Sequence, residues 1–153
     1  MNEVMAGPAL KEEREGPLAA EFDLVATAKK LTLFAAGAAT QRYAAKLGDE
    51  QEVMAALADM IMGVFTMESA VLRAQKMGGE GVGAAMARLY VAKAMDVVEL
   101  AARKVLAAAA EGDSLRTQMA ILRRLAKREP ADVIGLARAA AAQMVRAGRY
   151  SLA

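Results

Sequence analysis

The sequence predicts an all-α protein: an up-and-down bundle of three long helices followed by a C-terminal pair of shorter helices. The composition supports this, because 56% of the residues are hydrophobic and only 4% are aromatic. The apolar residues are mainly Ala, Leu, Val and Met, which apart from Val are good helix formers. The three prolines lie in the first 17 residues or near a predicted helix end, so they interrupt none of the long helices.

A chain of 153 residues can bury a substantial core within one domain. We predict that residues 1–17 form a charged, partly flexible lead-in and that residues 18–153 form a single helical-bundle domain. Within the lead-in, Gly7-Pro8 and Gly16-Pro17 are structure-breaking pairs on either side of the charged run KEERE.

The first long helix is expected over residues 18–47, with Gly48 ending it as a left-handed C-terminal residue. Lys29 and Lys30 are expected opposite its apolar face. Gly37 costs up to about 1 kcal/mol relative to Ala inside a helix, so we expect another backbone to approach closely there. The predicted apolar face comprises Leu24, Ala28, Leu31, Phe34, Ala35, Ala38 and Ala45.

The second helix is expected over residues 49–77. It begins with acidic residues and ends with Arg73 and Lys76, a polarity that suits the helix dipole. Gly63 and the acids Asp59 and Glu68 are unusual because they interrupt apolar runs. The predicted inward stripe comprises Val53, Leu57, Met60, Ile61, Val64, Val71 and Leu72.

Glycine-rich loops separate the remaining helices. The loop GGEGVG at residues 78–83 is predicted to be a plain connection, because it lacks the Lys-Ser/Thr ending of a phosphate-binding loop. The third helix is expected over residues 82–110, with Met86, Leu89, Ala94, Val97, Leu100, Ala101 and Val105 facing inward.

The C-terminal pair is expected to complete the bundle. Its first helix is capped by Asp113 or Ser114 and ends near Lys127. Its second helix has Pro130 in the first turn and ends at Gly148. The predicted inward side chains are Leu115, Met119, Leu122 and Leu125 or Ala126 in the first, and Val133, Leu136, Ala140, Met144 and Val145 in the second.

The sequence contains no histidine and no cysteine, which removes the commonest general base, the commonest metal ligand and thiol chemistry. Asp59, Glu68 and Asp96 remain as acids set in apolar runs. A buried carboxylate needs a cationic or hydrogen-bonding partner, and the candidate partners are Arg42, Arg73, Lys93 and Arg103. We favour ion pairs that fix helix register over an acid–base or metal role. The sequence therefore predicts no catalytic, cofactor-binding or metal-binding residue and no cofactor.

The charge distribution is uneven. Residues 1–114 carry 12 basic and 16 acidic side chains, whereas residues 115–153 carry 8 basic and 2 acidic ones. The basic segment either pairs with the acidic body, which we favour, or faces an anionic partner outside it. Its cluster Arg123, Arg124, Lys127 and Arg128 has only Tyr150 nearby for base stacking, so we predict no nucleic-acid partner.

Two stretches resemble a known family. LTLFAAGAATQRYAAKLGDEQEVMAALADMIMGVFTMESAVLRAQK at residues 31–76 and PADVIGLARAAAAQMVRAGRYSL at residues 130–152 are similar to the C-terminal helical extension of acyl-CoA dehydrogenases of the very-long-chain type and related bacterial enzymes. The resemblance follows the order of residues along most of the chain and rests on no short motif.

The resemblance implies that this chain has no catalytic role of its own. In that family FAD and acyl-CoA are bound by a core that precedes the extension, and the catalytic glutamate belongs to that core, so Glu68 inherits no role. The extension packs on the core, supports assembly and in some members carries membrane association. Because this chain begins at Met1, a free-standing product, a subunit of a split enzyme and a fragment all stay open.

We therefore expect a non-catalytic helical interaction module in fatty-acid oxidation that docks on an acyl-CoA dehydrogenase core or self-associates as a homo-oligomer. The alternative is a peripheral module that binds an anionic membrane surface through its basic last third. No apolar run approaches the roughly 20 residues that span a bilayer, and the charged head lacks a signal-peptide core, so a cytoplasmic location is expected.

Overall fold

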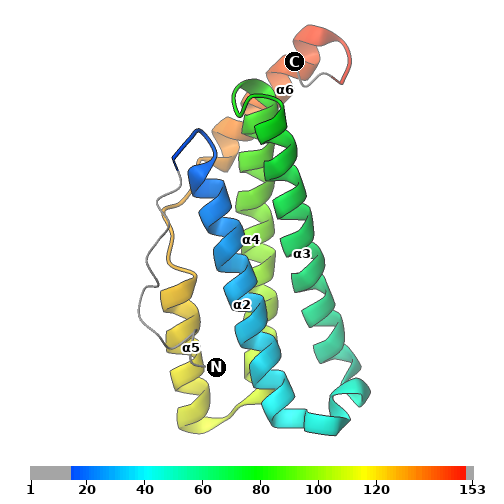
Figure 1. The fold of residues 1–153 in the computed structure, drawn as a ribbon, viewed down its shortest axis with the longest axis vertical. Coiled ribbons are helices and arrows are strands. Elements are labelled where there is room, and N and C mark those ends of the chain that lie inside the picture. The colour runs from blue at the N-terminus through cyan, green and yellow to red at the C-terminus, as the bar shows by residue number, and fades with distance from the viewer. Residues whose placement is uncertain (1–14, 151–153) are drawn as a thin grey trace.

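The computed structural model describes residues 15–150, so most of the predicted lead-in and residues 151–153 lie outside the described residues. The described elements are the α-helices α2 (Ala19–Tyr43), α3 (Gln51–Lys76), α4 (Gly81–Ala109), α5 (Gly112–Leu125) and α6 (Val133–Ala147), with the 3₁₀ helix η1 (Ala44–Asp49) between α2 and α3. No strand occurs within residues 15–150. The predicted fold class, three long helices and a shorter C-terminal pair, is confirmed (Figure 1).

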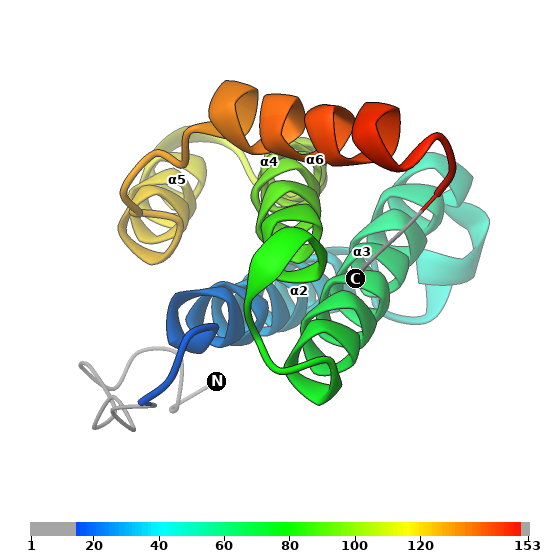
Figure 2. The same ribbon diagram turned by 90° about the horizontal axis from the view of Figure 1, so that it is seen from above.

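The long helices run up, down and up, and α4 is the central one. It packs against α2, α3, α5 and α6, whereas the main contacts of α3 are with α2, α4 and η1. Seen from above, α6 lies across α4, and α5 lies on the opposite side of the bundle from α3 (Figure 2). Helix α3 is therefore an edge helix with one long side uncovered by any other described helix.

Small side chains allow α4 to be surrounded in this way. Seven of its twelve buried residues are alanines, and the larger buried ones are Val91, Met95, Val98, Val105 and Leu106. Because an alanine face brings helix axes close together, the neighbouring helices can all reach one central helix. The alanines that are buried in α4 are Ala84, Ala87, Ala92, Ala94, Ala101, Ala102 and Ala109.

One glycine marks the tightest part of the α3–α4 contact. A Cβ atom built on Gly63 would lie 3.0 Å from Cγ2 of Val98. The opposite holds at Gly37 in α2, where a Cβ would meet no atom within 4 Å. The predicted close approach at Gly37 is therefore wrong, and the close approach occurs at Gly63 instead.

The first helix is shorter than predicted. It ends at Tyr43, and Ala44 takes a positive φ of 47° before the chain continues as η1. The Tyr43 hydroxyl donates a hydrogen bond of 2.9 Å to the carbonyl oxygen of Ala108, which fixes this end of α2 against α4. Gly48 lies within η1 and has no positive φ, so the predicted helix end at Gly48 is wrong.

The C-terminal helices begin differently from the prediction. Glu111 precedes α5 without a side-chain cap, so neither Asp113 nor Ser114 is its N-cap. Asp132 is the N-cap of α6, and its Oδ1 accepts a hydrogen bond of 2.8 Å from the Gly135 N–H. Pro130 precedes that helix, since the cap lies two residues after it.

The predicted end of α6 is confirmed: Gly148 follows its last residue in the left-handed region, with φ of 61°. No residue of α6 is fully buried, because the helix lies on the outside of α4. Val145, predicted to face inward, is 82% exposed.

The inward faces of α3 and α4 are rotated from the predicted ones. In α3, Ile61 and Leu72 are exposed, whereas Met67 is fully buried. In α4, Val97 and Leu100 are exposed, since the side chains one position further along, Val98 and Ala101, face the core. The helices carry apolar residues on more than one face, so hydrophobic spacing alone does not identify the buried face.

The two helical glycines provide a matched test of packing. We expect Gly63→Leu to destabilise the fold by about 1–3 kcal/mol, because the new side chain overpacks the contact with Val98. Gly37→Ala should raise stability by up to about 1 kcal/mol, since helix propensity improves and space is available. Urea denaturation of both variants followed by circular dichroism measures this, and equal destabilisation by the two changes would contradict it.

Candidate interaction surfaces

The three acids singled out in the sequence lie in different places. Asp59 is exposed on α3 and forms no ion pair with another described residue. Glu68 pairs across the α2–α3 contact with Lys29, at 2.7 Å between Nζ and Oε1. Lys29 therefore does not lie away from the other helices as predicted. Both side chains are about two-fifths exposed, so this pair contributes less than about 1 kcal/mol.

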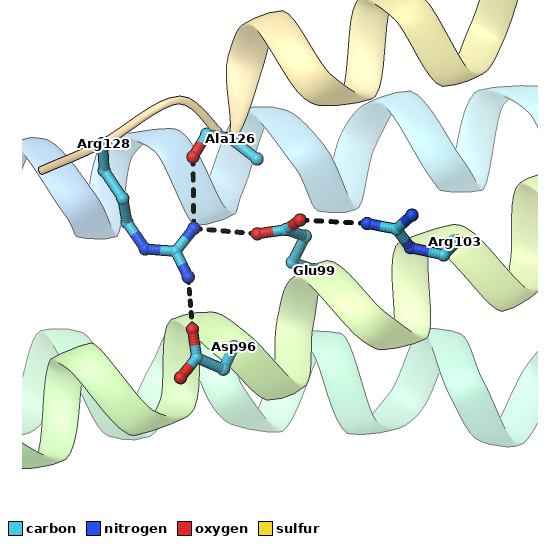
Figure 3. Close-up of polar contacts among 5 residues, drawn as sticks. All are labelled: Asp96, Glu99, Arg103, Ala126 and Arg128. Atoms are coloured by element: carbon cyan, nitrogen blue, oxygen red, sulfur yellow. Dashed lines mark hydrogen bonds and ion pairs between the residues drawn. The ribbon is translucent and has the colours of Figure 1, made fainter. Parts of the chain in front are cut away.

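Asp96 belongs to the densest polar contact in the described part of the chain, which we call the Arg128 clamp: Arg128 with Asp96 and Glu99 (Figure 3). The Arg128 guanidinium donates through Nη2 to Asp96 and through Nη1 to Glu99 at 2.8 Å. Nη1 also donates to the carbonyl oxygen of Ala126 at 3.1 Å. Arg103 donates to the other oxygen of Glu99 at 3.2 Å.

These partners differ from the predicted ones. Of Arg42, Arg73, Lys93 and Arg103, only Arg103 forms an ion pair with a described acid, and that acid is Glu99. The hypothesis of register-fixing ion pairs agrees with the contacts of Glu68 and Asp96, but their cations come from Lys29 and Arg128. Sequence spacing could not reveal Arg128, because it lies in the connection between α5 and α6 and reaches α4 only in the folded chain.

The clamp fixes the path of the chain from α5 to α6. Arg128 anchors that connection to two acids one helical turn apart on α4. Partial burial by itself lowers the pKa of Arg128, but the hydrogen bonds to Glu99 and Asp96 and their negative charges outweigh it and raise the pKa above its ordinary value. A basic group whose pKa is higher in the folded than in the unfolded protein stabilises the fold fully at pH values below its pKa in the unfolded chain. This stabilisation is lost only as the pH rises through the pKa of the folded state. The guanidinium is thus charged throughout the pH range in which proteins fold.

Removing Arg128 tests the clamp. We expect Arg128→Gln to destabilise the fold by about 1–3 kcal/mol, because Asp96 and Glu99 then face each other as like charges without a shared cation. The matched control is Arg124→Gln, an exposed residue of α5 without an ion pair among the described residues, expected within about 0.5 kcal/mol of the parent. Thermal unfolding at low and high salt measures both, and a loss no larger than that of the control would contradict the role of the clamp.

The second surface is an apolar row on the uncovered side of α3, which we call the outer strip: Met54, Ala58, Ile61, Phe65 and Leu72. Phe65 is 69% exposed and Ile61 59%. The inner row of α3 is separate and forms part of the core: Val53, Leu57, Met60, Met67, Val71 and Ala74. Contiguous large apolar side chains on a protein surface commonly mark an interaction site.

Helix α3 also meets a length and composition criterion for crossing a membrane, with a mean hydropathy of 1.5 over 18 residues, of which 22% are buried. The expectation that no apolar run approaches the length of a span is corrected for α3, whose apolar residues are interrupted only by isolated acids such as Asp59 and Glu68. A single helix of this kind is weak evidence for a span, and core helices of bundles meet the same criterion.

The basic last third pairs with the acidic body mainly through Arg128. Arg116 pairs within α5 with Asp113, at 2.6 Å. The other six basic side chains of this segment form no ion pair with a described residue: Arg123, Arg124, Lys127, Arg138, Arg146 and Arg149. The favoured interpretation, pairing within the molecule, therefore accounts for only a small part of the positive charge. No group of three acidic side chains suited to a metal ion occurs within residues 15–150.

Comparison with known proteins identifies the class to which this bundle belongs. The family model described as "Acyl-CoA dehydrogenase, C-terminal domain" matches residues 27–124. The chain belongs to this family, as the resemblance of its sequence indicated.

Two individual proteins extend the match. A "Probable acyl-CoA dehydrogenase" of Bacillus subtilis (strain 168) is 38% identical over 148 residues, which cover 93% of this chain and 25% of the relative. The crystal structure of an acyl-CoA dehydrogenase complexed with FAD from Bacillus anthracis superposes with a TM-score of 0.91 at 33% identity, covering 99% of this chain and 27% of that one. The chain thus spans about a quarter of the length of these relatives.

Proposed function

We propose that this chain is a non-catalytic interaction module of the acyl-CoA dehydrogenase type, which acts by contact with a dehydrogenase core or with a second copy of itself. The observation that carries the proposal is the outer strip of α3. Its large side chains are exposed, whereas the fully buried side chains of α3 all belong to the inner row. Covering such a strip removes apolar surface from water, at about 25 cal/mol per Å².

The family match supports the kind of partner. In the two relatives the matched region makes up about a quarter of the chain, and the other three-quarters lie outside it. When two domains belong to one polypeptide, each is present at a high effective concentration for the other. A small apolar face is then sufficient to hold them in contact. We accordingly propose a role in fatty-acid oxidation in the cytoplasm, without a cofactor bound to this chain.

Association of the purified proteins tests the proposal. We expect size-exclusion chromatography with light scattering to show self-association of the chain, or a complex with the part of the Bacillus subtilis relative that lies outside the matched 148 residues. Phe65→Lys should weaken whichever contact forms by about 100-fold, since it places a charge in an apolar interface. Val145→Lys is the control, as Val145 is also an exposed apolar residue but lies on α6.

Two results would contradict the proposal. One is a strict monomer that ignores the dehydrogenase core at all concentrations tested. The other is flavin absorbance in the purified chain before mixing, because it would indicate a cofactor site and thus a catalytic part of its own.

A second candidate function is binding to an anionic membrane surface through α6. The observation that favours it is the set of unpaired cations Arg138, Arg146 and Arg149 beside the exposed Ile134 and Val145. Helices with basic and apolar side chains of this kind bind at the headgroup boundary of anionic bilayers.

Vesicle co-sedimentation tests this second candidate. We expect binding to vesicles containing phosphatidylserine at low salt that falls at least about tenfold when Arg138, Arg146 and Arg149 are changed together to Gln, because each contributes about 1 kcal/mol near the surface. Changing Lys29, Lys30 and Lys46 to Gln removes equal charge elsewhere and serves as the control. Binding that ignores lipid charge and salt would rule this candidate out.

A further inference from the structure

The outer strip of α3 has the spacing of a coiled-coil seam. Its members Met54, Ala58, Ile61, Phe65 and Leu72, with Glu68 between the last two, follow one another at alternating steps of four and three residues. Alternating steps of this kind keep one narrow seam directed at a partner helix. The seam covers about 27 Å at a rise of 1.5 Å per residue.

The charges at the two ends of the seam complement each other. Glu50 lies four residues before Met54 at its beginning, and Lys76 lies four residues after Leu72 at its end. A second α3 running in the opposite direction would bring the acidic end of each copy to the basic end of the other, whereas a parallel copy would bring like charges together.

One antiparallel register satisfies the whole seam. When the centre lies at Gly63, Phe65 falls opposite Ile61 of the second copy, and Leu72 falls opposite Met54. Ala58 then falls opposite Glu68, where the small side chain leaves room for the Lys29–Glu68 pair. The same register brings Glu50 to the level of Lys76, so that the apolar layers are flanked by opposite charges.

We propose that α3 is a self-association face on which two copies of this chain pack their outer strips antiparallel. The twofold axis crosses the strip between Ile61 and Phe65, at the level of Gly63 along the helix. The position of α3 at the edge of the bundle permits this, because α5 lies on the opposite side of the bundle and α6 packs mainly on α4 (Figures 1 and 2). The inference rests on the proposed function, since it names the partner and the geometry of that contact. A twofold contact of this kind uses the same patch on both copies and closes on itself.

The first experiment measures the oligomeric state of the full chain by sedimentation equilibrium over a concentration series. We expect a monomer–dimer equilibrium whose dissociation constant rises at least about 100-fold in Phe65→Lys, because this residue lies in both central layers. Val145→Lys should leave the dissociation constant within about twofold of the parent.

The second experiment determines the direction of packing. The sequence contains no cysteine, so a single cysteine at a chosen position is the only site for a short bis-maleimide cross-linker. In the antiparallel register, Met54→Cys and Leu72→Cys should each fail to cross-link alone, since equal positions lie about 27 Å apart, and should cross-link when mixed. Parallel packing gives the reverse pattern and would overturn the inference.

The outcomes separate this inference from the proposed function. A dimer that Phe65→Lys leaves intact overturns the α3 interface but keeps self-association through another surface. A monomer that binds the dehydrogenase core through Phe65 also overturns it and assigns the outer strip to the core. A monomer that binds neither partner overturns the inference and the proposed function together.

Discussion

The bundle depends on close packing around the alanine face of α4. Seven buried alanines let the neighbouring helices reach one central helix, and a side chain of ordinary size at these positions would force them apart. This constraint explains the shape of the fold. Because α4 is shared by α2, α3, α5 and α6, each of the others needs only one inward row, and its remaining faces are left for other purposes. Gly63 extends the same principle into α3, where it brings the backbone within contact of Val98.

Polar contacts complement this packing at the places where apolar packing is thin. No residue of α6 is fully buried, and the connection that leads to it is held to α4 by the Arg128 clamp. Charge pairs with a defined geometry specify position more than they add stability, since desolvation offsets much of their attraction. The clamp therefore positions the connection that leads into α6, whereas the apolar core lies between the long helices.

The sequence predicted the fold class and the approximate extent of every helix, because Gly78, Gly79, Gly112 and Gly148 separate the apolar segments. It predicted the buried faces only in part: Met60 and Val71 are buried as expected, whereas Leu72 is exposed. Ile61 and Met67 are both apolar and both lie on α3, and only tertiary packing decides that Met67 enters the core. The break at Ala44 carries no local signal either, since it follows from the anchoring of Tyr43 to α4.

The same limit applies to the candidate surfaces. The acids Glu68 and Asp96 were recognisable as unusual, but their partners lie 39 and 32 residues away along the chain and belong to other elements. The outer strip was hidden because its residues Ile61 and Leu72 were assigned to the core, with which they share hydrophobic character. When a helix carries apolar residues on two faces, hydrophobic spacing is compatible with burial of either face. Only the folded structure shows which of the two faces of α3 enters the core.

The outer strip of α3 keeps large apolar side chains exposed to water. The inner row provides the fully buried side chains of α3, whereas Phe65 and Ile61 remain 69% and 59% exposed and thus contribute little to the core. Exposed residues of this kind add to the risk of non-specific association, and polar replacements on a solvent-facing helix surface would ordinarily have little effect on folding. The spacing of the outer strip also differs from that of the core row, since it follows a narrow seam and not a broad face. An apolar seam that the fold does not need is best explained by a surface that it meets after folding.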